Sequence, residues 1–380
     1  MSNIVIPDGG NIGSASDTDA ISISSSGAVT LSSDFVPATP LSNRNHLING
    51  DFQVAQRGAS FVAGANNDDT YNLDRWYLLS DGNDVVDVTQ SSTAPTNQLY
   101  SIGLDVETVN KKFGIAQIIE NKNCVGLVGN NVTFSFKAKV SATTKLDNIK
   151  AGIIAWSSTA DAVTSDVVSA WAVEGTNPTL ASNLTFENTP ANLNVTTSWA
   201  TYSVSADIDT SSTTNIIVFI WSDVTDTTAG DFLYITDCQL EQGSNATPFE
   251  HRSYGDELAR CQRYFQARTT KTNTAQLIAY GFNYAAAEID VNIELVVPMR
   301  ANPSIVQTSG TNYMSGFDGG ATTTFDNFSG VQHYAPKDNN VQRVNMYVGS
   351  LSGLTVGRVN MVVLSATGAN AFIFGFLAEL

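Results

Sequence analysis

The sequence has little charge, and most of that charge is negative. Of its 380 residues, 14% are charged, against about 25% in typical soluble domains. The 36 acidic residues outnumber the 19 basic ones and give a net charge of −17. Nucleic-acid binding depends on Lys and Arg that neutralise phosphates, so we expect no nucleic-acid partner. The polar surface must instead be built from Ser, Thr, Asn and Gly, which favours strands and turns.

Cysteine and histidine are rare as well. Cys124, Cys238 and Cys261 are widely spaced without a CxxC motif, which argues against a disulfide framework or a zinc site and predicts small buried thiols. None of the three histidines belongs to an HExxH or HxH motif. The GxSxG, GxGxxG and Walker motifs are missing, and nothing singles out a glycosidase pair among the carboxylates. The sequence therefore contains no recognised catalytic motif.

Long apolar segments are also missing. No apolar run approaches the ~20 residues that span a bilayer. The start "MSNIVIPDGG" has neither the basic nor the apolar region of a signal peptide. We expect no membrane insertion.

Residues 1–45 differ from the rest and are predicted to form an N-terminal attachment arm. In "AISISSSGAVTLSS" the apolar residues Ile21, Ile23, Val29 and Leu31 keep a period of two around Gly27, which predicts a hairpin or a strand of an intertwined assembly. These side chains are too few to bury a core alone. We expect them to pack against another subunit or a larger particle.

Residues 46–252 contain about ten short strand patterns separated by turn clusters, without a βαβ rhythm. The clearest is "VTFSFKAKV" (Val132–Val140), whose alternation predicts a half-buried antiparallel strand. Phe52–Gln56 is predicted to be an opening strand, with turns at Asn49-Gly50 and Arg57-Gly58. The predicted fold class is all-β: a jelly-roll β-sandwich. It is followed by a short connecting helix at 253–267, indicated by the apolar stripe of "GDELARCQRYFQA", and by a second, C-terminal β-domain at 268–380.

The five tryptophans all lie in the sandwich region, where they either fill the core or stack on sugar rings. Trp76 and Trp221 lie in apolar strands and are predicted to be core residues. Trp156 and Trp171 border a polar stretch and are candidate glycan-binding residues. The oxygen-rich loops at 66–74 and 223–231 either hold calcium or are simply solvated.

Several motifs occur in order along the chain: "LINGDFQVAQRGASF", "YNLDRWYL", "QLEQGSNATPFEHR", "ELARCQRYFQ", "VPMRANPS" and a terminal Ala-Glu-Leu. This pattern resembles the jelly-roll module of bacteriophage tail-fibre and virion structural proteins, whose fold is like that of carbohydrate-binding modules. The resemblance covers roughly residues 46–304 and, more weakly, the C-terminus.

The resemblance implies a non-enzymatic, usually trimeric virion protein, assembled in the bacterial cytoplasm. It also implies a candidate structural calcium at Asp51 and Asp237, and no other cofactor. Arg57 and Arg75 are expected to pair with acids at the edge of the domain, as scaffold.

The leading hypothesis is a short tail fibre or a capsid (head) fibre. Residues 1–45 would attach it to capsid, portal or tail proteins, and its β-domains would bind host surface polysaccharide. Loops near Tyr313–Phe328 and Val331–Asn340 are candidate recognition loops, with Tyr313, Phe317 and Tyr334 as candidate glycan-binding residues. A purely structural capsid or tail decoration protein is the alternative, and a polysaccharide-cleaving tailspike is a third reading.

Overall fold

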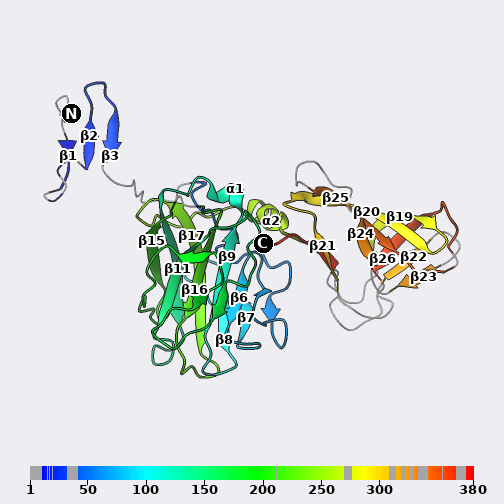
Figure 1. The fold of residues 1–380 in the computed structure, drawn as a ribbon, viewed down its shortest axis with the longest axis horizontal. Coiled ribbons are helices and arrows are strands. Elements are labelled where there is room, and N and C mark those ends of the chain that lie inside the picture. Colours follow the sequence, from blue (N-terminus) through cyan, green and yellow to red (C-terminus); the bar gives the residue numbers. More distant parts are fainter. Residues whose placement is uncertain are drawn as a thin grey trace.

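The structure is a computed structural model. It describes residues 11–14, 16, 18, 20–31, 42–209, 212–268, 276–307, 314–317, 322–325, 328–332, 341–352, 354–364 and 374–380. Figure 1 shows three β-rich parts in chain order: a small N-terminal sheet, a large sandwich and a C-terminal group of sheets. The described helices are short: α1 (Asn121–Cys124) and α2 (Tyr254–Gln262). The predicted all-β class is confirmed.

Two six-stranded antiparallel sheets form the sandwich. The β10 sheet contains, in spatial order, β15 (Ala200–Asp207), β10 (Asn131–Val140), β17 (Phe232–Gln242), β8 (Ser101–Val106), β7 (Val86–Ser91) and β4 (Ser60–Phe61). The β11 sheet contains β14 (Leu184–Phe186), β11 (Ile149–Trp156), β16 (Asn215–Ser222), β9 (Phe113–Ile119), β6 (Tyr77–Ser80) and β5 (Thr70–Tyr71).

The connectivity of these strands is that of a jelly roll. From β8 to β17 the chain crosses between the sheets at every step except from β11 to β14. The resulting orders, β8-β17-β10-β15 and β9-β16-β11-β14, interleave two Greek keys as eight-stranded jelly rolls do. The β11–β14 connection carries a small two-stranded hairpin, β12 (Val168–Ala170) and β13 (Thr179–Leu180). The predicted jelly roll is confirmed by this chain's own strand order.

The core of the sandwich follows from the alternation in its strands. In β10, the apolar set from Val132 to Val140 is buried between the sheets, while Lys137 and Lys139 point outward. Trp76 is completely buried between the sheets, as predicted. Trp221 is also completely buried, but in a second hydrophobic cluster on the other side of the β11 sheet. The three cysteines are free and buried, also as predicted.

The predicted strand at Phe52–Gln56 is wrong. The structure has no ladder there, and the first strand of the domain is β4. Asn49 and Phe52 both have a positive φ, 58° and 56°, a conformation incompatible with a strand. Phe52 is nevertheless fully buried. Two turns replace the strand: in the first the Phe52 N–H donates to the Asn49 carbonyl, and in the second the Gly58 N–H donates to the Ala55 carbonyl.

The described residues of the C-terminal part form two sheets. A three-stranded sheet joins β18 (Phe265–Ala267), β27 (Phe374–Leu377) and β21 (Ser304–Gln307). A seven-stranded sheet has the order β23 (Thr322–Phe325), β22 (Met314–Phe317), β26 (Val359–Leu364), β19 (Gln276–Ala285), β20 (Glu288–Met299), β25 (Val341–Val348) and β24 (Gly330–Gln332). These strands share their own hydrophobic cluster.

The N-terminal part is a three-stranded sheet of β1 (Asn11–Ile12), β2 (Ile21–Ile23) and β3 (Val29–Leu31). The predicted hairpin is confirmed: Ile21 pairs with Leu31, and Ile23 pairs with Val29. Directly opposed residues point to the same face, so these four side chains form one apolar face. Val29 and Leu31 are exposed.

Candidate functional site

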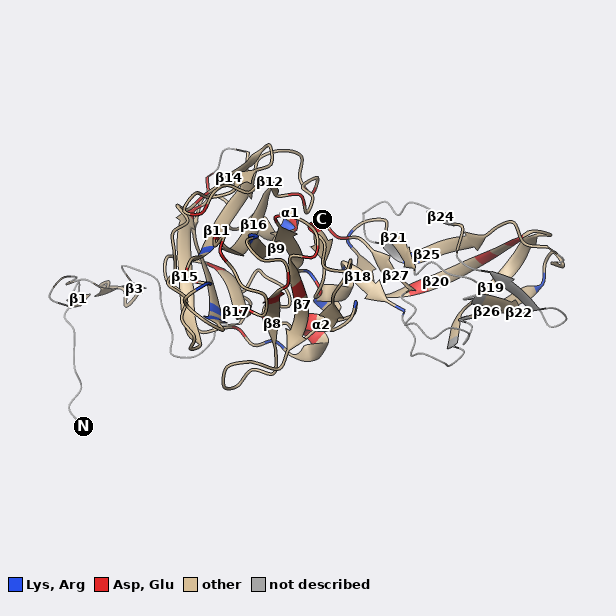
Figure 2. Ribbon diagram, turned by 90° about the horizontal axis from the view of Figure 1, so that it is seen from below, with Lys and Arg blue, Asp and Glu red and all other residues tan. Residues whose placement is uncertain are grey.

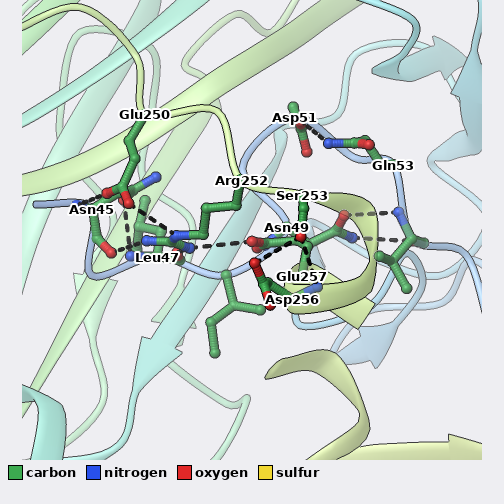
Figure 3. A network of polar contacts seen from close by, with 12 residues as sticks. Asn45, Leu47, Asn49, Asp51, Gln53, Glu250, Arg252, Ser253, Asp256 and Glu257 are labelled. Atoms are coloured by element: carbon green, nitrogen blue, oxygen red, sulfur yellow. Dashed lines mark hydrogen bonds and ion pairs between the residues drawn. The ribbon is translucent and has the colours of Figure 1, made fainter. Parts of the chain in front are cut away.

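The sequence motifs at the two ends of the jelly roll meet in a buried polar network (Figure 3). The Glu250 carboxylate accepts hydrogen bonds from the backbone N–H groups of Asn43 and Asn45, at 2.7 and 2.8 Å. Arg252 donates to the Leu47 carbonyl at 2.8 Å and contacts Glu257 of α2 at 3.3 Å. The donors and acceptors named here are paired with one another within the chain, so the network holds the two ends of the jelly roll together.

Asn49 connects that network to the first residues of the jelly roll. Its Nδ2 donates to the carbonyls of Val54 and Asp74, at 2.9 and 3.0 Å, and its Oδ1 accepts from Val54 N at 2.9 Å. Trp76 Nε1 donates to the Asn49 carbonyl at 3.0 Å. The Asn side chain and its positive φ explain why the motif begins with Asn-Gly: the bend is fixed by side-chain hydrogen bonds where no strand ladder exists.

Arg57 and Arg75 hold the C-terminus of the chain. Arg57 pairs with Glu379 at 3.1 Å, and the buried Arg75 pairs with the same carboxylate. The Arg75 guanidinium also donates to the Ile118 carbonyl and lies 3.7 Å from the centroid of the Tyr264 ring. The predicted pairing of both arginines with acids is confirmed.

The candidate calcium residues already have other partners. Asp237 Oδ2 lies 2.8 Å from the Lys137 ammonium, and its Oδ1 accepts a hydrogen bond from Gln98. Asp51 accepts one from the side-chain amide of Gln53. Calcium requires six to eight oxygen ligands, whereas here an ammonium and two amide N–H groups face the carboxylates. The residues present do not fit a calcium ion. Within the described ranges, no cluster of three or more His, Cys, Asp or Glu is arranged to hold a metal.

The two sheets of the jelly roll differ in their outward faces. The outward face of the β11 sheet is apolar: Ile217, Phe219 and Trp221 of β16 lie on it. The segment 157–183 between β11 and β14 lies over this face and packs Val163 and Val167 against it. We call it the covered face.

Trp156 and Trp171 belong to the covered face. Both are half-buried against its hydrophobic cluster. The Trp171 ring lies 6.1 Å from the Phe219 ring, and Trp156 Nε1 donates to the Thr159 carbonyl at 2.9 Å. Their predicted glycan-binding role is untested, but the structure gives both a packing role.

The outward face of the β10 sheet carries a different set of aromatic residues. Trp199, Phe232 and Tyr234 are half-buried and belong to none of the hydrophobic clusters of the described residues. The Tyr234 ring stacks on Phe232 at 5.2 Å and lies 6.4 Å from Trp199. We call these three residues the aromatic platform.

The strand register fixes the platform in place. Tyr234 pairs with Lys139 on one side and with Gly103 on the other. A side chain at position 103 would come within 3.3 Å of the Tyr234 ring, so Gly103 lets that ring lie over β8. The Lys139 ammonium is 5.3 Å from the centroid of Tyr234 and 5.8 Å from that of Trp199, within the range of cation–π contacts.

A small pocket lies beside the platform, at the level of Lys137, which is two residues along β10 from Lys139. Its volume is about 230 Å³. It is lined by Ser135, Phe136, Lys137, Thr201, Asp237, Thr247, Pro248, Phe249 and His251. Lys137 and Lys139 point to the same side of β10, so the pocket and the platform share one face. This face combines ring surfaces with an ammonium, a carboxylate and hydroxyls.

The other predicted site residues are distributed as follows. Phe317 lies in β22 and is exposed, far along the chain from the platform and in a different sheet. Tyr313 and Tyr334 lie outside the described residues. Trp199, Phe232 and Tyr234 were not predicted from the sequence as binding residues, although "FLYI" alternates Phe232 and Tyr234 with the buried Leu233 and Ile235. That alternation was the available signal.

The chain has no match among protein-family models. No curated protein matches its sequence. Solved structures that align with this chain include the enzymatically active domain of tailspike protein 4 of bacteriophage CBA120. Its sequence identity is 17% and its TM-score 0.31, and the match covers 52% of this chain and 21% of that one.

Two further matches are to sugar-binding folds. One is a putative sugar binding protein from Bacteroides thetaiotaomicron, at 15% identity and a TM-score of 0.32, covering 52% of this chain and 100% of that one. The other is the CBM22-1-CBM22-2 tandem domain of Xyn10C from Paenibacillus barcinonensis, at 10% identity and a TM-score of 0.30, covering 90% and 98%. With scores this low, the jelly-roll assignment rests on the strand order given above.

None of the helices in the described part of the chain is long and apolar enough to cross a membrane.

Proposed function

We propose that this chain is a non-enzymatic appendage of a bacteriophage virion and that it binds host surface polysaccharide through the aromatic platform. The observation that carries the binding proposal is the platform itself: Trp199, Phe232 and Tyr234 on the polar, outward face of the β10 sheet. Large aromatic side chains outside a hydrophobic cluster are costly to leave in water, and a ligand that covers them recovers that free energy.

The chemistry of the platform suits a sugar better than an apolar ligand. Aromatic faces bind the C–H faces of sugar rings, while hydroxyl groups require donors and acceptors beside the ring. Lys139 supplies a donor between two rings, and the ion pair of Lys137 and Asp237 lines the adjoining pocket. A small number of polar groups beside apolar surface is the usual composition of a specific ligand site.

The virion part of the proposal rests on the sequence motifs and on the N-terminal sheet. Ile21, Ile23, Val29 and Leu31 form an apolar face on the three-stranded N-terminal sheet, and none of these side chains is buried. We propose that this face attaches the chain to capsid, portal or tail proteins, that the appendage is a homotrimer, and that it is assembled in the host cytoplasm.

Affinity electrophoresis through gels containing host surface polysaccharide tests the binding proposal. The unmodified chain should be retarded, and Trp199→Ala should lose at least tenfold in affinity, which corresponds to ~1.4 kcal/mol. Trp156→Ala is the matched control, because Trp156 is also half-buried but lies in the covered face; its binding should be unchanged. Equal loss in both variants would contradict the proposal.

The same experiment separates the competing functions. If no polysaccharide retards the chain, the decoration protein becomes the better hypothesis. Release of new reducing ends during incubation with the polysaccharide would instead indicate a tailspike enzyme. Attachment is tested separately: Val29→Asp in the full chain should abolish incorporation into virions, with polysaccharide binding intact.

A further inference from the structure

The aromatic platform lies beside two carboxylates on the same outward face. Phe232 of β17 pairs with Asp105 of β8, and Asp105 pairs in turn with Asp87 of β7. Directly opposed residues of an antiparallel sheet point to the same side, so a ring and two carboxylates follow one another across three neighbouring strands. We call Asp87 and Asp105 the carboxylate pair. Figure 2 shows the acidic residues of these strands in red and the basic residues in blue.

The carboxylate pair lacks the cation that other acids of this face have. Asp237, in the pocket beside the platform, pairs with Lys137 at 2.8 Å. Asp87 instead accepts a hydrogen bond from the uncharged amide of Asn66, at 3.0 Å. Asp105 Oδ1 is shielded from water and has no hydrogen-bond partner among the described residues. In the same part of the chain, the charges that act on these two carboxylates are all negative.

This arrangement is unfavourable for the protein alone. Burial and the charges of Glu107 and Asp87 raise the pKa of Asp105. Burial and the charges of Glu107 and Asp84 raise the pKa of Asp87. Both shifts mean that the folded state disfavours the charged form of these side chains, and like charges directly opposed on a sheet are destabilising as well. Carboxylates with such a cost, next to a binding surface, are candidates for contact with a ligand.

A positively charged amine fits this position. An ammonium group donates charge-assisted hydrogen bonds to carboxylates, and these are roughly twice as strong as neutral ones. The face of an aromatic ring attracts the same charge, and Phe232 is the cross-strand neighbour of Asp105. A sugar hydroxyl would leave the negative charge uncompensated, and an acidic sugar would be repelled.

A metal ion is the other cation that two carboxylates attract. Calcium requires six to eight oxygen ligands, but the side-chain N–H of Asn66 occupies one oxygen of Asp87. No cluster of three or more His, Cys, Asp or Glu is arranged to hold a metal in the part of the chain that the structure describes. The carboxylate pair therefore suits an organic ammonium better than a metal ion.

We infer that the polysaccharide bound at the platform contains an amino sugar with a free, charged amino group, and that this group lies at the carboxylate pair. The inference rests on the proposed function, because the ring of the sugar stacks on the platform. Asp105 is then the residue that selects the amino sugar. The Lys139 ammonium, on the other side of Tyr234, repels the amino group, so the sugar has one favoured orientation.

Affinity electrophoresis with host surface polysaccharide before and after N-acetylation tests this inference. Acetic anhydride converts free amino groups to neutral amides and leaves the sugar rings in place. The unmodified chain should lose at least about tenfold in affinity for the acetylated form. Asp105→Asn should lose as much for the untreated polysaccharide and should bind both forms equally. Asp207→Asn is the matched control, because Asp207 is exposed on the same sheet at the far end of β15 from Trp199; it should behave like the unmodified chain.

The outcomes separate this inference from the proposed function. If N-acetylation leaves binding unchanged while Trp199→Ala still weakens it, the inference is overturned and the platform stands. Binding that survives N-acetylation but is lost with EDTA would assign the carboxylates to a metal ion and also overturn it. If neither form of the polysaccharide binds, both the inference and the proposed function fail.

Urea denaturation distinguishes a binding role of Asp105 from a structural one. Asp105→Asn removes a repulsion between like charges, so its unfolding midpoint should not fall below that of the unmodified chain. If the variant fails to fold, the comparison of the two polysaccharide forms on the unmodified chain still decides, because it needs no substitution.

Discussion

The two outward faces of the jelly roll are built from similar residues but lie in different surroundings. Both faces include tryptophans that are half-buried in the structure. Trp156 ends β11 and Trp171 lies in the segment that covers the β11 sheet, whereas Trp199 directly precedes β15 of the β10 sheet. The segment 157–183 turns the first face into a second hydrophobic cluster, whereas no such cluster includes Trp199. The difference shows that the role of an aromatic residue here depends on whether a distant loop covers its sheet.

The covered face is also held by buried charges. Asp223 accepts from Lys112 and pairs with Lys150 at 2.8 Å, and its Oδ2 accepts from Gly175 N at 2.9 Å. Lys112 further donates to the Val173 carbonyl at 3.1 Å. Since Gly175 and Val173 belong to the covering segment, this ion cluster fastens that segment to the sheet.

The largest predicted effect is the loss of that cluster. Asp223→Asn leaves two buried ammonium groups without a carboxylate and should lower the free energy of unfolding by about 3–5 kcal/mol, measured by urea denaturation. Asp226→Asn is the control, because its partner Lys145 is at the surface, and its midpoint should barely change. Equal midpoints for the two variants would show that the cluster does not stabilise the covered face.

The C-terminus completes the covered face and gives the next largest effect. Leu380 packs into its hydrophobic cluster, the Tyr71 hydroxyl donates to the Leu380 carbonyl oxygen at 2.7 Å, and Glu379 neutralises the buried Arg75. Glu379→Ala should lower the free energy of unfolding by about 2–4 kcal/mol, because Arg75 then lies buried without a charge partner. Thermal unfolding that matches the unmodified chain would contradict this role.

The third prediction compares one tryptophan from each face, in stability and in polysaccharide binding. Trp171→Ala should lower the free energy of unfolding by about 2–3 kcal/mol, less than for a fully buried tryptophan, and leave polysaccharide binding unchanged. Trp199→Ala should change stability by less than about 1 kcal/mol, the usual range for surface positions, and weaken binding. Chemical denaturation measures the stability of both variants, and affinity electrophoresis measures their binding. A variant that loses both stability and binding would contradict the separation of roles between the two faces.

The smallest predicted effect depends on pH. Burial and the charges of Asp68 and Asp166 raise the pKa of Asp69 to about 6, and Asp166 lies in the segment that covers the β11 sheet. Because the folded state binds this proton more tightly than the unfolded state, Asp69 costs stability as pH rises from about 4 to 6. Asp69→Asn should therefore raise the melting temperature slightly at pH 7.5 and leave it unchanged at pH 3.5. A gain at both pH values would assign the effect to backbone conformation, since Asp69 has a φ of 60°.

The sequence predicted the parts of the fold that depend on local pattern. The alternation from Val132 to Val140 fixed which face of β10 is buried, and apolar neighbours placed Trp76 and Trp221 in cores. The motifs correctly indicated that Arg57 and Arg75 pair with acids.

Features that depend on distant contacts could not be predicted. Glu379 meets Arg75 across 304 residues, and no local pattern names that partner. The strand expected at Phe52 is replaced by turns, which the side-chain hydrogen bonds of Asn49 help to stabilise. Trp171 was preferred over Trp199 because the sequence does not show which sheet the segment 157–183 covers.

Hydroxyl-radical footprinting with and without host polysaccharide tests the central claim most directly, because it reports the solvent access of each aromatic side chain. Trp199, Phe232 and Tyr234 should become protected when polysaccharide is added, while Trp156, Trp171 and the exposed Phe282 and Tyr284 keep their oxidation rates. Protection of Trp156 and Trp171, with Trp199 and Tyr234 unchanged, would contradict the claim that the chain binds glycan through the β10 sheet.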